Sequence, residues 1–334
     1  MKYGISLGYT SKLNLKETVE AISVTKNLLK ESLKKNFNLI EVGSSIVTEK
    51  NIWLNDDSQQ TRRPIDFDAP SNFEYGELLQ TNNKWRRYFL YKAEMSENDQ
   101  GIFTDFTTVA RDAKINNVTS LTFEEFGMEI VKSEYDVEVI KDIIVKIFET
   151  VTRVDYKVSK MFDVLEDKHF GETLTFITYK KLRDLYPLLT FKERLTKFGK
   201  DNGAFVLQNF VEKMFNQNDV EQFSSDVFDF ETYSKIYYYN KSCEKVMGLG
   251  YVSFQVDREM LKRQNNILKE TQKSQTQYNH LVKSNELPLT ISAGIFINRM
   301  LIGTLEKQHI AEVHSSIWDQ EFIDYCETNK IKIL

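Results

Sequence analysis

Two arginines lie at junctions between predicted strands and the segments that follow them, a placement that suits phosphate binding. Arg111 lies between two apolar runs that could form a hairpin, and Arg299 follows the apolar run 290–298. A guanidinium group is planar and permanently charged, so it can hold two phosphate oxygens at once. The sequence therefore predicts phosphate contacts at both residues. For each, a surface arginine at a turn or at the start of a helix is the alternative.

Three glutamates are candidates for a metal or substrate site. Glu124 and Glu125 end an apolar run, and Glu244 follows Cys243. Mg²⁺ takes hard oxygen ligands, usually one or two carboxylates together with substrate phosphates. The alternative for all three residues is a carboxylate that is simply solvated at the surface.

A basic and aromatic run, Lys84–Tyr88, offers positive charge beside flat rings. Such a run could bind an anionic substrate or the backbone of a nucleic acid. The alternative is structural. The segment 84–91 also resembles an edge strand with one face in water.

Several common catalytic motifs are absent from the sequence. It contains no Walker loop and no GxGxxG, HExxH, GxSxG or paired CxxC motif, which argues against the enzyme classes that depend on them. The four histidines are scattered along the chain, and the two nearest the C-terminus, His309 and His314, do not have the spacing of metal ligands on a helix. A histidine metal site is therefore not expected.

The elements that must position these residues alternate between helices and short strands. Asn14 can cap a helix whose apolar residues recur every three to four positions from Leu15 to Leu33. A second long helix is expected between Tyr135 and Phe162, and a third after Asp257 and ending near residue 284. Shorter helices are expected at 179–186, 191–200 and 299–307. Strands are expected at 38–47, 101–106, 120–124, 174–177, 204–207, 227–230, 236–240, 250–256 and 289–297.

This order of elements predicts an α+β fold. Strand-rich stretches outnumber regular strand–helix–strand units, so a large, mostly antiparallel sheet with helices packed on it is expected. The chain has only 13 glycines and 4 prolines and no low-complexity stretch. A single domain over residues 1–334 accounts for this pattern.

Composition limits the partners that the protein could have. The chain carries 44 Lys plus Arg against 49 Asp plus Glu, a formal net charge of −5, so nucleic acid is not an expected partner. The sequence contains no run of about 18 apolar residues, the length that a membrane-spanning helix needs. Two cysteines, Cys243 and Cys326, are too few for a disulfide framework. A reducing, cytoplasmic location is expected.

The motifs and their order resemble the class II aminoacyl-tRNA synthetase fold. The shared features are a helix leading into Leu39–Val42, a hairpin that carries an arginine, and a glycine-containing strand that ends in Asn298–Arg299 before a helix. Within that fold the chain resembles the ammonia-dependent asparagine synthetases, the aspartate–ammonia ligase family. The resembling blocks are collinear: Leu39–Val42, Lys84–Arg87, Phe254–Asp257, Leu287–Ile291, Gly294–Ile295, Arg299, His309–Val313 and Ile317–Trp318.

The resemblance implies a two-step ligation that uses ATP, Mg²⁺, aspartate and ammonia. The side-chain carboxylate of aspartate would attack the α-phosphorus of ATP, giving β-aspartyl-AMP and pyrophosphate, and ammonia would then displace AMP to leave asparagine. Arginine and Mg²⁺ neutralise phosphate charge in such a displacement. The resemblance further implies a homodimer without an anticodon-binding domain.

Residue roles follow from the same resemblance. Arg111 would contact the α-phosphate and Arg299 the terminal phosphate of ATP, and Gly294 would be a further ATP-binding residue. Lys84 would contact the carboxylate of the substrate. The acidic positions near substrate and metal would be Glu124, Glu125 and Glu244.

Several positions depart from the pattern of the family. Ser45 replaces a proline of motif 1, and Glu125 replaces a glutamine that helps to recognise the substrate. Phe296 replaces a motif 3 glycine that lets the strand approach the adenine ring. Gly248 replaces an acidic residue of the ATP site. The stretch 216–226 lacks most of the polar residues of the family, and 51–53 lacks an aspartate of the ammonia pocket.

These departures leave three expectations for function. The chain is an aspartate–ammonia ligase, an adenylating ligase for another acid, or a catalytically inactive relative that acts as a binding or regulatory subunit. Resemblance to a family supports its fold more directly than its activity.

Overall fold

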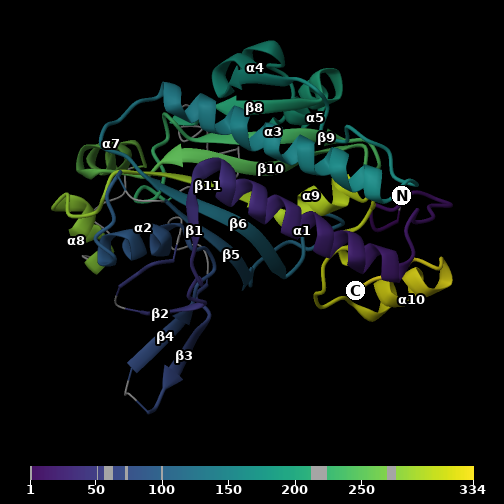
Figure 1. Ribbon diagram of the computed structural model, residues 1–334, viewed down its shortest axis with the longest axis horizontal. Helices are drawn as coiled ribbons and strands as arrows, with labels where there is room; N and C mark the ends of the chain where they lie inside the picture. Colours follow the sequence, from purple (N-terminus) through teal and green to yellow (C-terminus); the bar gives the residue numbers. More distant parts are fainter. Residues whose placement is uncertain are drawn as a thin grey trace.

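A sheet of eight strands forms the centre of the protein in the computed structural model (Figure 1). The structure describes residues 2–50, 52–55, 63–71, 74–98, 101–211, 224–268 and 276–334. Across the sheet lie β1 (Leu39–Glu41), β5 (Gly101–Val109), β6 (Thr122–Val131), β11 (Thr290–Phe296), β10 (Lys245–Phe254), β9 (Ser234–Asn240), β8 (Ala204–Gln208) and β7 (Leu174–Thr178). The outermost pairs, β1–β5 and β7–β8, are parallel and the other neighbouring pairs are antiparallel. This confirms the mostly antiparallel sheet.

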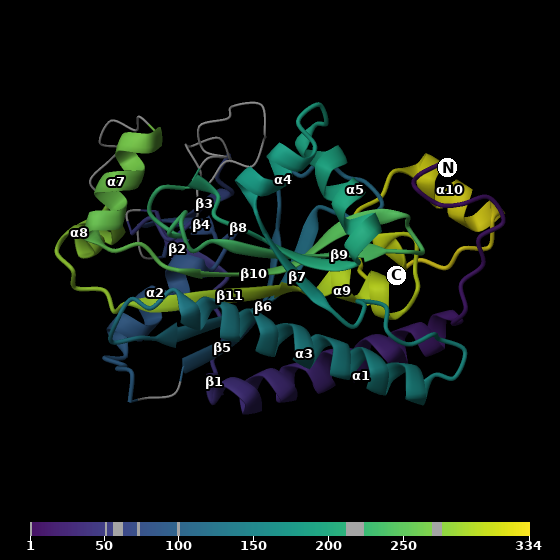
Figure 2. The ribbon, with the colours of Figure 1, turned by 90° about the horizontal axis from the view of Figure 1, so that it is seen from above.

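Two long helices, α1 (Leu15–Phe37) and α3 (Glu138–Met161), run side by side along one face of the sheet (Figure 2). Their buried residues, such as Leu29 and Ile144, share one core with Phe103 and Phe126 of the sheet. The opposite side carries α2 (Asn83–Lys92), α4 (Tyr179–Leu185), α5 (Phe191–Asn202), α7 (Arg258–Leu268) and α8 (Gln277–Lys283). The remaining helices are α9 (Ile297–Thr304) and α10 (Gln320–Thr328).

The first predicted helix is confirmed together with its cap. Asn14 Oδ1 accepts a hydrogen bond from the Glu17 amide at 3.0 Å, and Glu17 Oε2 accepts one from the Asn14 amide at 2.9 Å. This reciprocal capping box satisfies two backbone donors that the first helical turn would otherwise leave unpaired. The helix ends at Asn38, whose left-handed backbone (φ 53°) turns the chain into β1.

Side chains on the central strands alternate between the two faces of the sheet, as the pleat requires. On β6, Phe126 and Met128 join the core under α1 and α3, whereas Glu125, Gly127 and Glu129 face Arg86 of α2. Polar residues and glycines therefore collect on the face away from the two long helices.

The prediction of a strand at 84–91 is wrong, because this segment forms α2. Lys84, Arg86 and Arg87 are all buried in it. An edge strand with one wet face would have placed these charges in water. Here the basic side chains are buried instead, because Glu129 of the sheet accepts from Arg86 and the Val256 carbonyl, just after β10, accepts from Arg87.

Three further predictions change in extent. Asp257 caps a helix as expected, with its Oδ1 accepting from the Met260 amide at 2.8 Å, but the expected long helix is not continuous, since Thr276 has extended backbone and caps α8 anew. Residues 227–230 form turns joined to the sheet by a single bridge at Phe228. The expected strand 38–47 is shorter and ends at Glu41.

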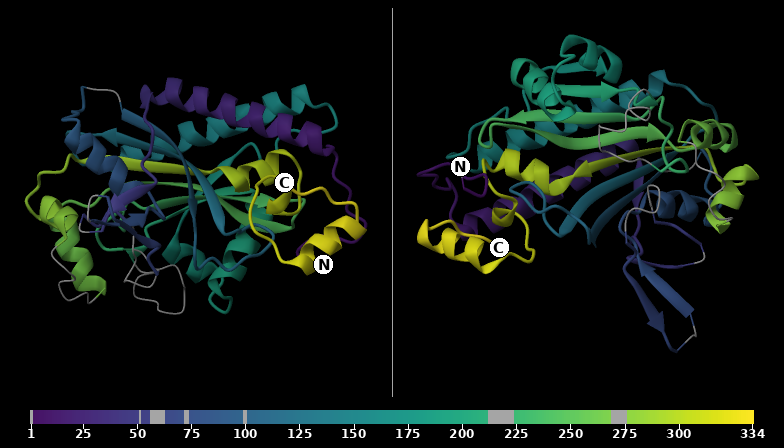
Figure 3. Two further views of the ribbon diagram at one scale, coloured as in Figure 1. Left: turned by 90° about the horizontal axis from the view of Figure 1, so that it is seen from below. Right: turned by 180° about the vertical axis from the view of Figure 1, so that it is seen from behind.

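A small second sheet extends from the body beneath α2 (Figures 1 and 3). Its order is β2 (Val47–Glu49), β4 (Glu74–Leu78) and β3 (Asp66–Ala69). Among the described helices, none is long and apolar enough to cross a membrane.

Candidate functional site

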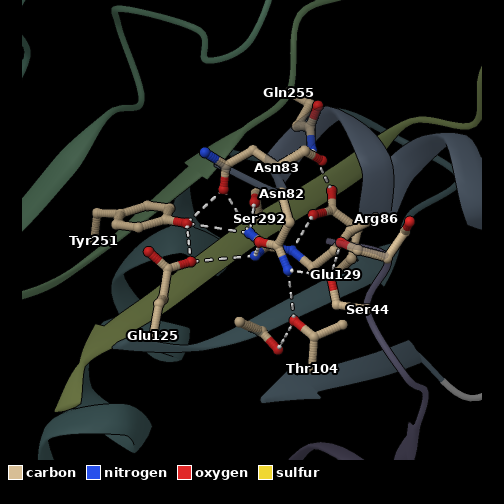
Figure 4. A network of polar contacts seen from close by, with 12 residues as sticks. Ser44, Asn82, Asn83, Arg86, Thr104, Glu125, Glu129, Tyr251, Gln255 and Ser292 are labelled. Carbon is tan, nitrogen blue, oxygen red and sulfur yellow. Dashed lines mark hydrogen bonds and ion pairs between the residues drawn. The ribbon is translucent and has the colours of Figure 1, made fainter. Parts of the chain in front are cut away.

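A buried guanidinium group is the centre of a polar network on the face of the sheet away from α1 and α3 (Figure 4). Arg86 Nη2 donates to Asn83 Oδ1 at 2.7 Å, to Ser292 Oγ at 2.8 Å and to the Tyr251 hydroxyl at 3.1 Å. Its Nη1 and Nε lie 3.2 and 3.3 Å from carboxylate oxygens of Glu125 and Glu129. The network thus connects α2 to three strands, β6, β10 and β11.

Glycine at position 127 makes room for this guanidinium. A Cβ on Gly127 would lie 2.1 Å from Arg86 Nη1 and 2.8 Å from Thr104 Oγ1. No real Cβ contact is that short, so a side chain on this strand position would displace Arg86. Glycine is required here because the Arg86 guanidinium lies against the backbone, and not because the chain turns.

The network holds one cation between two carboxylates. Burial raises the pKa of both Glu125 and Glu129, and the charge of Arg86 opposes that rise. Burial acts to lower the pKa of Arg86, but Tyr251 and the two glutamates together raise it above its usual value. Arg86 is therefore charged at all physiological pH values, which keeps the centre of the network cationic.

A second buried ion pair involves Lys84, two residues before Arg86 on α2. Lys84 Nζ lies 2.7 Å from Asp226 Oδ2, and Asn279 Nδ2 of α8 donates to the same oxygen at 2.7 Å. The Lys84 ammonium also lies 5.2 Å from the centre of the Tyr278 ring. Although burial raises the pKa of Asp226, the neighbouring Lys84 outweighs it and holds that pKa below its ordinary value. Lys84, predicted to bind a carboxylate, is paired with one from the chain itself.

Glu124 and Glu125 are adjacent in sequence but face opposite sides of the sheet. Glu125 belongs to the network around Arg86, whereas Glu124 forms an ion pair with Lys26 of α1. Of the two predicted carboxylates, only Glu125 therefore lies on the face that carries Lys84 and Arg86. The strand pleat separates them.

Motif 3 places Arg299 and Phe296 together at the end of β11. The Arg299 guanidinium lies 5.2 Å from the centre of the Phe296 ring. The same ring lies 6.4 Å from Phe123 of β6 and 5.9 Å from Tyr251 of β10. Gly294 lies two residues earlier on the same face, since a Cβ there would meet Tyr251 and Glu125. Gly294 and Arg299 are thus brought to the side of the sheet that carries Glu125.

Two other predicted site residues, Arg111 and Glu244, lie at exposed positions in the connections between strands. Arg111 is exposed on the connection between β5 and β6, and its Nη1 donates to the Pro64 carbonyl at 2.6 Å. Glu244 is exposed in the turn between β9 and β10, with φ 47°. In the residues that the structure describes, no group of three or more His, Cys, Asp or Glu side chains could hold a metal ion.

The departures from the family pattern fall partly within the described chain. Gly248 of β10 faces Arg299, and Ser45 is half-buried, with its hydroxyl directed to the Val47 carbonyl. Ile52 packs against the apolar cluster under α2 and α8. Residues 51 and 216–223 lie outside the described residues.

The sequence patterns predict no individual role for Arg86 or for its partners Asn83, Tyr251 and Gln255. Gln255 Nε2 donates to Glu129 at 2.8 Å and so closes one end of the network. A signal was present in the strand itself. Glutamates at 125 and 129 flank a glycine at alternate positions, a pattern that places two carboxylates and an open space on one buried face.

Comparisons with known proteins agree over nearly the whole chain. A family model described as aspartate–ammonia ligase matches residues 16–330. Aspartate–ammonia ligase of Clostridium perfringens is 31% identical over 337 residues, covering 100% of this chain and 99% of that protein. That of Clostridium tetani is 30% identical and covers 98% and 96%, respectively.

Solved structures that are similar in fold are class II synthetases. Asparaginyl-tRNA synthetase of Pyrococcus horikoshii, complexed with asparaginyl-adenylate, has a TM-score of 0.66 at 10% identity and covers 90% of this chain and 68% of its own. The enzyme of Entamoeba histolytica gives a TM-score of 0.63 at 10% identity, with 90% and 67% covered. At such identity the likeness shows the class II synthetase fold. Sequence and fold together show that this chain belongs to the aspartate–ammonia ligase family.

Proposed function

We propose that the protein makes asparagine from aspartate and ammonia with ATP, by way of an aspartyl adenylate. The observation that carries this proposal is the family match over residues 16–330. The structure supports it by placing Lys84, Glu125, Gly294 and Arg299 on one face of the sheet.

The chemistry proceeds in two displacements. A carboxylate oxygen of aspartate forms a bond to the α-phosphorus, and the bond from that phosphorus to pyrophosphate breaks. Ammonia nitrogen then forms a bond to the activated carbonyl carbon, the bond from that carbon to the oxygen of AMP breaks, and a proton leaves nitrogen. The first step needs positive charge around the phosphates, because charge builds up on their oxygens in the transition state.

The cationic residues have distinct places in this scheme. Arg299, half-buried at the start of α9, would hold the terminal phosphate, and Arg111 would reach the α-phosphate from the connection between β5 and β6. Lys84 would bind a carboxylate of aspartate. In the structure Asp226 already occupies that ammonium group at 2.7 Å, so the substrate carboxylate would have to take the place of Asp226.

The residues at the expected metal positions do not suit Mg²⁺. The sequence assigns the metal to Glu244, which lies in the exposed turn before β10. The three atoms nearest to a Cβ placed on Gly248 belong to the side chains of Arg299, Lys235 and Phe296, none of which offers an oxygen ligand. Because these residues do not fit a protein-bound Mg²⁺, we assign no step to a metal.

We further propose that the protein is a cytoplasmic homodimer that pairs through α1 and β1. β1 ends the strand order of the sheet, so its outer edge is open to another chain. Val19 of α1 is 50% exposed and Ile40 of β1 is 45% exposed, and Ile46 also exposes its side chain. The two cysteines, Cys243 and Cys326, are free and buried, which suits a reducing compartment.

The ligase assignment is tested by product analysis. Purified protein is incubated with ATP, Mg²⁺, aspartate and ammonium, and AMP and asparagine are measured together. Equal amounts of both, lost in Arg299→Ala, support the proposal. If AMP forms only with a different carboxylic acid, that acid and not aspartate is the substrate, and the adenylation chemistry still holds. The absence of AMP with every acid overturns both.

A second candidate is a relative that binds its ligands without catalysis, and the position of Phe296 favours it. The phenyl ring lies between Phe123 and the Arg299 guanidinium, where the resemblance to the family places the adenine ring. On this candidate, Phe296→Gly should raise the affinity for ATP about tenfold, since it opens the stacking position.

Titration calorimetry with ATP measures this effect, and Phe67→Ala on the exposed strand β3 serves as a matched control that leaves the affinity unchanged. Thermal unfolding shows whether the added strand glycine has lowered stability. If wild-type protein binds ATP as tightly as Phe296→Gly, the ring does not block adenine and the second candidate fails.

A further inference from the structure

Cationic side chains from two elements meet over the bare backbone of Gly248. A Cβ on this residue would lie 3.2 Å from Arg299 Nη1 and 3.2 Å from Lys235 Cε. Lys235 belongs to β9 and is 8% exposed, and Arg299 belongs to α9 and is half-buried. Two basic side chains thus meet at a position that carries no side chain of its own.

A third cation adjoins this pair. Lys245, at the start of β10, is half-buried and donates from Nζ to Asn117 Oδ1 at 2.7 Å. Burial lowers its pKa, and the charges of Lys192 and Arg299 lower it further. Lys245 therefore lies within the positive field of Arg299.

The surroundings shape this cluster for a ligand with several negative charges. The Arg299 guanidinium is held over the Phe296 ring at 5.2 Å, which fixes its direction. The missing side chain at Gly248 leaves its backbone open to a close approach. Ammonium and guanidinium groups donate hydrogen bonds to phosphate oxygens but cannot coordinate a metal ion.

We propose that Lys235 and Arg299 form a diphosphate site, with Lys245 adding to its positive field, that binds the phosphate tail of the nucleotide without a divalent cation. This rests on the proposed function for the identity of the nucleotide. Lys235 and Arg299 would each take phosphate oxygens from one side of Gly248, and the ammonium groups would supply the charge that Mg²⁺ supplies in many ATP sites.

Calorimetric titration of the full chain, with ATP and separately with inorganic pyrophosphate, tests the site. Each ligand is measured once in excess EDTA and once in excess Mg²⁺. Both ligands should bind in EDTA. Lys235→Met, which keeps the aliphatic stem, should weaken this binding about tenfold, the loss expected for one charge-assisted hydrogen bond. Lys241→Ala, in the exposed turn after β9, is the matched control and should change nothing.

A charge reversal distinguishes a cation site from a metal site. Lys235→Asp should abolish binding in EDTA and restore part of it in Mg²⁺, because it places a carboxylate beside Gly248. Thermal unfolding midpoints of the variants identify any loss of folding. Should Lys235→Met fail to fold, Arg299→Lys replaces it, since it keeps the charge but loses the fork of donors.

The outcomes separate this inference from the proposed function. Wild-type binding that requires Mg²⁺, or Lys235→Met that binds like wild type, overturns the inference and leaves the ligase proposal intact. Pyrophosphate that binds in EDTA while ATP does not bind supports the diphosphate site and contradicts the ligase. Failure of both ligands to bind overturns both.

Discussion

Arg86 joins more of the molecule than any other residue described above, because its guanidinium reaches β6, β10 and β11 from α2. Replacing it with methionine should lower the free energy of unfolding by about 3–5 kcal/mol, since Glu125 and Glu129 would remain buried without their counter-charge. Urea unfolding measures the change. The exposed Arg153→Met on α3 is the control and should have little effect.

The cause can be separated from the loss of packing by a second substitution. Adding Glu129→Gln to Arg86→Met removes one of the two unpaired carboxylates, so it should recover part of the lost stability. A double variant that is less stable than Arg86→Met would contradict the electrostatic explanation.

The sequence predicted which residues lie in the site better than it predicted which side chains pair with one another. The resemblance singled out Lys84, Glu125 and Arg299, and these do lie on one face of the sheet. It also grouped Glu124 with Glu125, but side chains alternate along a strand, so the structure separates them. Pairings such as Lys84 with Asp226 join residues that are 142 positions apart, and no local pattern contains that information.

At the scale of elements, α3 is fixed to the end of α9 by a histidine between two carboxylates. His169 Nδ1 lies 2.9 Å from Asp155 and its Nε2 lies 3.3 Å from Glu306. Burial acts to lower the pKa of His169, but the two carboxylates outweigh it and raise the pKa to about 9. The charged imidazole is therefore favoured in the folded protein over the unfolded chain.

This arrangement predicts a stability that falls in alkaline solution. The raised pKa of His169 adds to the free energy of unfolding, and this contribution is complete below the ordinary histidine pKa of about 6.5. It is lost as the pH rises through the pKa of the folded state, and the loss is up to about 3 kcal/mol. Urea unfolding at a series of pH values should show this decline between neutral pH and pH 9. It should be absent in His169→Gln and kept in His280→Gln, where the replaced side chain is exposed. The same decline in His169→Gln would assign it to other groups.

The elements themselves were largely predictable wherever one face is apolar. α1 and α3 follow their apolar spacing, and β5 and β11 follow short apolar runs, whereas β6 extends to Val131, well beyond the expected 120–124. α2 was mistaken for a strand because its buried face is basic. Burial of charge depends on counter-charges from other strands, and a reading of hydrophobic periodicity cannot detect them.

At the scale of the whole molecule, the open edge at β1 and the exposed apolar residues of α1 and β1 predict a dimer. Light scattering coupled to size-exclusion chromatography should give twice the chain mass for the wild type. Val19→Glu combined with Ile40→Glu should give the monomer, because two buried charges at such an interface are costly. Leu188→Glu, at an exposed site between α4 and α5, should remain dimeric. A wild type that is monomeric at micromolar concentration would contradict the proposed interface.

Transfer of an oxygen isotope shows whether the carboxylate of aspartate attacks the α-phosphorus of ATP on this protein. Aspartate carrying a heavy oxygen isotope in its side-chain carboxylate is supplied with ATP, Mg²⁺ and ammonium, and the mass of the AMP formed is measured by mass spectrometry. We expect AMP that carries one heavy oxygen, formed in equal amount with asparagine. AMP without the label, or no AMP while nucleotide is bound, would contradict it.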